Sequence, residues 1–90
     1  MGYEEELLTI TMEECAEVIQ ACSKIIRFGP DSSYGGMTAI ESLEKELGDL
    51  QCMIDLLHAN DMVSYTAMDD YAADKRDKLK TWSNLFEFED

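Results

Sequence analysis

Apolar residues recur at steps of three and four along most of this chain, which is the spacing of one face of an α-helix. In a first segment, about residues 4–28, the recurring positions are Leu7, Thr11, Glu14, Val18, Ala21 and Ile25. In a second, about residues 38–59, they are Ile40, Leu43, Leu47, Leu50, Ile54 and Leu57. A third, about residues 61–82, carries Met68, Tyr71, Lys75, Leu79 and Trp82. The pattern predicts an all-α protomer with two long antiparallel helices and a third helix.

The starts of the second and third helices have local signals. Thr38-x-x-Glu41 is a capping box, in which each side chain accepts a hydrogen bond from the other residue's backbone N–H. Asn60 or Asp61 is expected to cap the third helix, because both side chains accept hydrogen bonds from the first turn.

The first helix has a clear end and an ambiguous start. Gly29-Pro30 should terminate it, since glycine accepts the left-handed closing geometry and proline cannot continue a helix. Thr9 or Thr11 could equally cap a later beginning. The polar, glycine-rich segment 29–37 that follows is either a plain interhelical loop or a mobile flap near a substrate.

Length and charge narrow the choice of function. Ninety residues make a single domain (1–90), and 46% hydrophobic residues exceed what three helices hide internally, so self-association is expected. The formal net charge of −13 disfavours binding to nucleic acid and attracts divalent cations. No apolar run approaches the roughly 20 residues that span a bilayer. Three cysteines without a CxxC pattern or a targeting peptide indicate free thiols in a cytoplasmic protein.

Two acidic pairs carry the candidate chemistry: Glu14-x-x-Glu17 and Glu46-x-x-Asp49. Chance alone gives roughly four acidic pairs at this spacing in so acidic a chain, and most of those are solvated surface pairs. Glu14, however, falls inside the apolar stripe of its helix, where an unpaired carboxylate is costly. Antiparallel packing would bring the two pairs together, and hard oxygen ligands of this kind suit Mg²⁺.

Basic residues are few, and two interpretations stay open for most of them. Lys24 and Arg27 lie at the end of the first helix, where a positive charge interacts favourably with the helix dipole. Lys75 and Lys78 share one face of the third helix, where their stems could simply cover apolar surface. Arg27, Lys75 and Lys78 could instead contact the phosphates of a substrate.

At the acidic pairs the chain resembles the MazG-like, all-α nucleoside triphosphate pyrophosphohydrolases, whose signature is EExxE on one helix and ExxD on the next. The matching residues here are Glu13-Glu14-Cys15-Ala16-Glu17, followed by Glu46-Leu47-Gly48-Asp49 within KELGDL. The resemblance covers roughly residues 11–82. The stretch KIIRFG and the short length also resemble small phage-encoded members, which would act in the cytoplasm of the host.

The resemblance implies hydrolysis of a nucleoside triphosphate, with a dNTP favoured, to a monophosphate and pyrophosphate. It implies Mg²⁺ as cofactor, with Mn²⁺ as a possible substitute, and a four-helix core formed in a homodimer or homotetramer. The implied metal ligands are Glu14, Glu17, Glu46 and Asp49. Glu13 and Glu14 are the implied catalytic residues, with Glu13 orienting or deprotonating the attacking water. On the third helix Asp74, Lys75 and Asp70 compete for a substrate-binding role.

A competing interpretation is a non-catalytic acidic helical module, which would bind a protein partner or mimic nucleic acid. The overall charge fits this module, but the inward position of Glu14 argues against it. A di-iron helical bundle is disfavoured, because such bundles use Glu-x-x-His pairs and the sequence has none.

Overall fold

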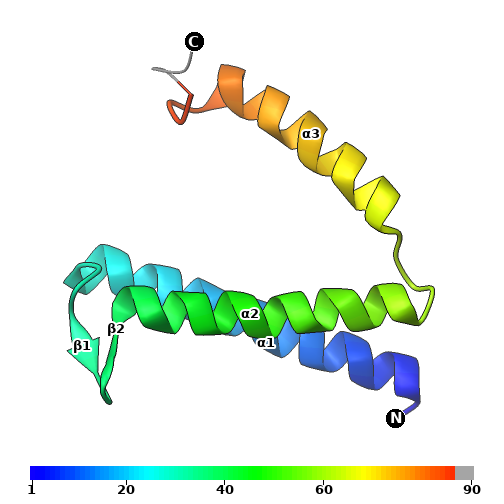
Figure 1. The fold of residues 1–90 in the computed structure, drawn as a ribbon, viewed down its shortest axis with the longest axis horizontal. Coiled ribbons are helices and arrows are strands. Elements are labelled where there is room, and N and C mark those ends of the chain that lie inside the picture. Colours follow the sequence, from blue (N-terminus) through cyan, green and yellow to red (C-terminus); the bar gives the residue numbers. More distant parts are fainter. Residues whose placement is uncertain (87–90) are drawn as a thin grey trace.

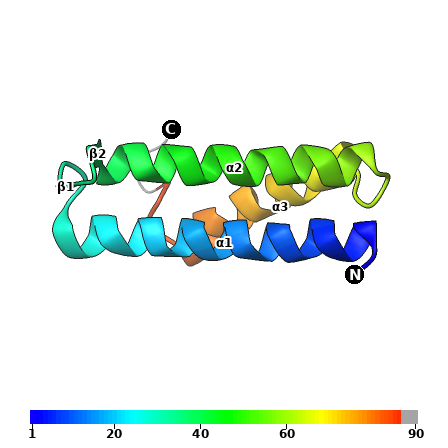
Figure 2. The ribbon, with the colours of Figure 1, turned by 90° about the horizontal axis from the view of Figure 1, so that it is seen from below.

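A computed structural model describes residues 1–86 and confirms a mainly helical chain with three helices. These are α1 (Tyr3–Phe28), α2 (Ala39–Ala59) and α3 (Tyr65–Trp82). Helices α1 and α2 run antiparallel and side by side along their whole length (Figures 1 and 2). The last four residues of the predicted domain 1–90 lie outside the described residues.

Helix α1 begins earlier than a threonine cap would allow. Its first residue is Tyr3, and the hydroxyls of Thr9 and Thr11 each donate a hydrogen bond, 2.7 Å long, to the backbone carbonyl four residues before. Both threonines are therefore interior helical residues that bond back to the preceding turn. The predicted end is confirmed: Gly29 follows the last residue with φ +90°, a conformation that side chains rarely adopt.

The connector between α1 and α2 holds a small hairpin that hydrophobic periodicity did not predict. Strand β1 (Ser33–Tyr34) pairs antiparallel with β2 (Met37–Thr38), so that Ser33 faces Thr38 and Tyr34 faces Met37. The two-residue turn is Gly35–Gly36, with φ +63° and +86°. Positive φ at both positions is what tight hairpin turns require, which explains the paired glycines.

The predicted capping box at the start of α2 is confirmed. The Glu41 N–H donates to the Thr38 hydroxyl over 3.1 Å, and the Thr38 N–H donates to the Glu41 carboxylate over 3.0 Å. These bonds hold the pKa of Glu41 below its ordinary value, because they favour the charged carboxylate. The cap joins β2 directly to α2 and so fixes the hairpin against the helix start.

The predicted cap of α3 is wrong, because Asn60 and Asp61 belong to the end of α2. The Asn60 side-chain amide donates to the Leu56 carbonyl over 2.7 Å, and Asp61 adopts a left-handed φ of +58°. Ser64 caps α3 instead, accepting a hydrogen bond from the backbone N–H of Ala67. The helix therefore begins later than predicted, at Tyr65.

The buried core is small and lies at one end of the helix pair. Leu7 of α1 packs with Met53 and Leu57 of α2, and the linker residues Met62 and Val63 cover them. Among the described residues five side chains are buried, and the two outside this cluster are alanines. So small a core indicates that a single copy of the chain leaves much of its apolar surface uncovered.

Helix α3 turns away from the α1–α2 pair (Figure 1), and none of its residues, all of which the structure describes, is buried. Its attachment runs through Tyr65, which stacks on His58 with ring centroids 3.9 Å apart and donates a hydrogen bond to Asp55. Trp82 and Tyr71 are 81% and 71% exposed. Over the described residues, no helix is long and apolar enough to cross a membrane.

Candidate metal centre

Three of the four predicted metal ligands meet at the middle of the α1–α2 interface. One carboxylate oxygen from each of Glu14, Glu46 and Asp49 lies within 4.8 Å of the others, and all three side chains are partly buried. The antiparallel pairing explains the meeting, because Leu7 contacts the region of Met53 and Leu57, and the same register places Glu14 level with 46–49. The structure thus brings three of the four predicted ligands together, and their role as metal ligands stays a prediction.

The pKa of Glu14, at the centre of this cluster, is raised above its ordinary value. Partial burial is the main cause, followed by the negative charges of Asp49 and Glu46, with a smaller contribution from Glu17. Both effects penalise the charged carboxylate. A divalent cation among the three carboxylates would reverse the penalty, since opposite charge favours ionisation.

Lys45 partly neutralises the cluster and was missed by the sequence analysis. Its ammonium donates to Asp49 over 3.0 Å and lies 3.5 Å from Glu46. The pKa of Lys45 is raised, chiefly by the hydrogen bond from its ammonium to Asp49. The spacing Lys45-x-x-x-Asp49 is an i, i+4 pair, which was the available signal. One ammonium facing three carboxylates leaves the cluster negative and suited to a cation.

The remaining acidic candidates of α1 lie outside the cluster. Glu17 is exposed and sits one turn beyond Glu14, although its charge still raises the Glu14 pKa. Glu13 is exposed and, at 100° per residue, projects to the side of the α1–α2 interface on which Asp49 also lies. The structure therefore assembles three predicted ligands and leaves Glu17 and Glu13 at the rim.

The predicted substrate-binding residues are dispersed. Arg27 lies in the last turn of α1, with its guanidinium 5.0 Å from the ring centroid of Phe28. Asp74, Lys75 and Lys78 are exposed on α3, which diverges from the helix pair that holds the cluster (Figure 1). Within one protomer the α3 residues are thus separated from the carboxylates, and their role stays a prediction.

The α1–α2 pair has one charged side and one apolar side. A projection at 100° per residue puts Glu13, Glu17, Lys24, Lys45 and Asp49 on the charged side. The same projection puts Leu8, Cys15, Ile19, Cys22, Ile26, Ile40, Leu43, Leu47, Leu50 and Ile54 on the apolar side. The carboxylate cluster therefore opens toward the charged side, while the opposite side offers surface for packing.

Glu14→Gln should stabilise the protein in the absence of metal, because it removes a carboxylate that is penalised by partial burial and by the neighbouring negative charges. Because the folded-state pKa of Glu14 is raised above 4.5, the wild type should lose stability as pH rises from 4.5 through that pKa. Glu41 and Asp55 have lowered pKa values, so they stabilise the fold in their charged forms. Their contribution to stability is lost as pH falls, below the range in which Glu14 titrates. Thermal unfolding in EDTA at roughly pH 4 to 8 should therefore show curves that diverge above 4.5. Parallel curves for wild type and variant would contradict the assigned repulsion.

Comparisons of the chain with protein-family models, with curated proteins and with solved structures gave no match. The resemblance to the MazG-like enzymes therefore stays a prediction that rests on the residues of the two acidic motifs.

Proposed function

We propose that this protein is a Mg²⁺-dependent nucleoside triphosphate pyrophosphohydrolase that releases a nucleoside monophosphate and pyrophosphate. The observation that carries the proposal is the convergence of Glu14, Glu46 and Asp49 across two helices, with oxygens within 4.8 Å of one another. These are members of the two motifs that resemble the MazG-like signature. The raised pKa of Glu14 supports it, since carboxylates crowded in this way favour a bound cation.

The donor set fits a hard divalent cation. Three carboxylates supply part of an oxygen shell, and phosphate oxygens of a nucleotide would complete it, which is the usual mode for Mg²⁺. Bound Mg²⁺ would polarise the phosphoryl oxygens and lower the pKa of a coordinated water. Glu46 and Asp49 would orient the ion from α2, and Glu14 would hold it from α1. Mn²⁺ prefers the same ligands and should substitute.

The other acidic residues at the rim have distinct proposed roles. Glu13 projects to the open, charged side and could accept the proton of the attacking water. Glu17 lies near enough to influence Glu14 and would reach the ion through a water molecule or after a side-chain rotation. Lys45 would release Asp49 to the cation and turn toward the phosphates, where its charge would stabilise the leaving pyrophosphate.

We propose a homodimer as the active form, with the apolar sides of two α1–α2 pairs forming a four-helix core. In one copy Ile19, Ile26 and Leu47 on that side are 69%, 85% and 46% exposed. About 20 residues of each helix span roughly 30 Å by 20 Å, or about 600 Å² for each protomer. This is near the roughly 800 Å² for each partner of a stable interface.

In the dimer, α3 would pack on the partner copy, and its charged residues would contact the substrate bound there. Because α3 turns away from its own helix pair (Figure 1), its exposed Tyr71 and Trp82 could cover the second copy. Asp74, Lys75 and Lys78 would then reach the phosphates bound to the partner copy, and Arg27 those of its own. Two such dimers could pair as a homotetramer.

Product analysis tests the activity directly. The purified protein should convert at least one member of a panel of NTPs and dNTPs to the monophosphate and pyrophosphate, in a reaction that needs Mg²⁺ or Mn²⁺. Inorganic phosphate and a diphosphate as products would instead indicate cleavage at the terminal phosphate. No turnover with either metal would favour the acidic interaction module, whose net charge of −13 remains consistent with a basic partner.

A further inference from the structure

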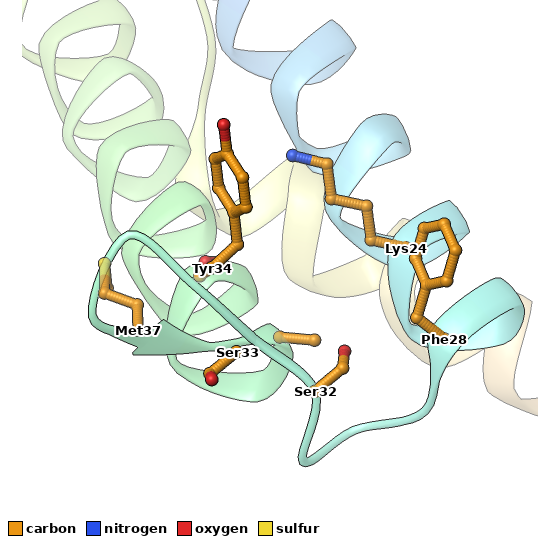
Figure 3. Close-up of a pocket in the computed structure, with 8 residues that line it drawn as sticks. Lys24, Phe28, Ser32, Ser33, Tyr34 and Met37 are labelled. Carbon is orange, nitrogen blue, oxygen red and sulfur yellow. The ribbon is translucent and has the colours of Figure 1, made fainter.

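A cavity of about 600 Å³ lies where the end of α1, the hairpin and the start of α2 meet (Figure 3). Its size falls in the range of small-molecule sites, which span roughly 300–1,000 Å³. The side chains that give it chemical character are Lys24, Phe28, Tyr34, Met37 and Ser42. From the sequence alone, this segment is predicted to be a loop or a flap, and Lys24 to interact with the helix dipole.

The cavity opens on the same side of the helix pair as the carboxylate cluster. Lys24 follows Glu17 by two helical turns on α1, and Ser42 precedes Asp49 by two turns on α2. Seven residues of helix rise about 10 Å, so the cluster and the cavity are neighbours along one side of the helix pair. One extended ligand of nucleotide size could therefore occupy both.

The lining combines apolar surface with one positive charge. Phe28 and Tyr34 offer aromatic rings, and Met37 offers a thioether that adapts to flat rings. None of the residues that line the cavity carries a carboxylate, although the chain as a whole has 20 acidic residues. An anionic group that is repelled over most of this protein would meet Lys24 here instead.

The side chains point in directions that suit a ligand extending from the carboxylate cluster into the cavity. Figure 3 shows the Lys24 ammonium and the Tyr34 hydroxyl extending the same way from opposite walls. A helical side chain leans toward the N-terminus of its helix, which for Lys24 is the direction of Glu17 and Glu14. Tyr34 is 91% exposed, so its ring has apolar surface left to cover. Both residues therefore line the cavity, with Lys24 leaning toward the carboxylate cluster.

We infer that this cavity receives the nucleoside half of the substrate, with the base against Phe28 and Tyr34. Lys24 would contact the α-phosphate on its cavity side, and the cation held by Glu14, Glu46 and Asp49 would contact the α-phosphate and the phosphates beyond it. The inference rests on the proposed pyrophosphohydrolase function and assigns base recognition to the hairpin. Two glycines at the turn would let the hairpin adjust over the base.

Kinetics of Tyr34→Ala and Phe28→Ala test the inference in the full-length protein. Loss of stacking on one ring should raise KM for the preferred nucleotide about tenfold or more, with kcat changed much less. The spread of KM values across the four bases should also narrow. Tyr3→Ala is the matched control, an exposed tyrosine at the far end of α1, and should leave both constants unchanged.

Amide chemical shifts distinguish binding in the cavity at the hairpin from binding at the carboxylate cluster. With Mg²⁺ and a nucleoside 5′-(α,β-imido)triphosphate, signals of Gly35 and Gly36 in the hairpin and Gly48 beside Asp49 should all move. With Mg²⁺ and inorganic triphosphate, only Gly48 should move. If both variants turn over the nucleotide with unchanged KM, and the amide signals of Gly35 and Gly36 do not move, the cavity assignment is overturned while the enzyme function stands. Absence of turnover together with an unmoved Gly48 would overturn both.

Discussion

Glu46→Gln should lower kcat about a thousandfold while leaving the protein folded. The substitution keeps the size of the side chain but removes the negative charge that would hold the cation against α2. Losing one preorganised electrostatic contact at a reacting phosphate typically lowers kcat by about 10² to 10³, and a displaced cation affects both the attacking and the leaving oxygens. Pyrophosphate release under saturating nucleotide and Mg²⁺ measures the loss.

Measurements of thermal stability distinguish a loss of catalytic activity from unfolding of the variant. In EDTA the Glu46→Gln variant should melt at or above the wild-type temperature, because one carboxylate facing Glu14 is gone. Added Mg²⁺ should raise the melting temperature of the wild type, since a ligand that binds the folded state stabilises it. The variant should show little of this increase.

Glu44→Gln is the matched control for this experiment. Glu44 lies on the same helix, is exposed and is outside the carboxylate cluster. Its substitution makes the same change in net charge, so a general effect of protein charge would appear in both variants. An active Glu46→Gln enzyme, or an equal loss in Glu44→Gln, would remove the support for the ligand assignment.

The helix pair was predictable because its signals are local and mutually consistent. Periodicity placed Leu7, Val18 and Ala21 on one face, and the capping box at Thr38 marked the start of α2 within one residue. The position of Glu14 inside the apolar stripe then predicted its approach to the second acidic motif. Antiparallel pairing of two long helices leaves few alternatives for which residues are level with each other.

Other features depend on tertiary geometry that periodicity does not encode. Glu17 has the same spacing from Glu14 as Asp49 has from Glu46, yet only Asp49 reaches the cluster. A step of three residues rotates a side chain by 60° away from its neighbour, and the side chains that face it decide whether it makes contact. Lys45 was overlooked because its role comes from its ion pairs with Asp49 and Glu46, and these become visible only in the folded structure.

The connector and the third helix were less predictable for a similar reason. Two-residue strands are too short for an alternating pattern, and the Gly35–Gly36 turn was the only local sign of the hairpin. The start of α3 was misplaced because Asn60, Asp61 and Ser64 are all good caps, and contacts of Met62 and Val63 with the core select the last. The orientation of α3 depends on what covers it.

Leu47→Glu should convert a dimer of the protein to a monomer. Leu47 is 46% exposed in one copy, so a carboxylate there would meet water and leave the protomer itself nearly unchanged. In the proposed four-helix core the same carboxylate would be buried without a partner, and two copies of it would face one apolar interface. Burying a leucine contributes about 2 kcal/mol, and an unpaired charge in its place costs several kcal/mol more.

Light scattering after size exclusion measures the outcome, with the wild type expected at twice the chain mass of 10.2 kDa and Leu47→Glu at the chain mass. Gln20→Glu is the matched control: it adds a carboxylate to an exposed position on the charged side of α1 and should leave the dimer intact. The monomeric variant should also lose turnover if Lys75 and Lys78 act on the partner copy. A dimer that survives Leu47→Glu but dissociates with Gln20→Glu would place the interface on the charged side, over the carboxylate cluster.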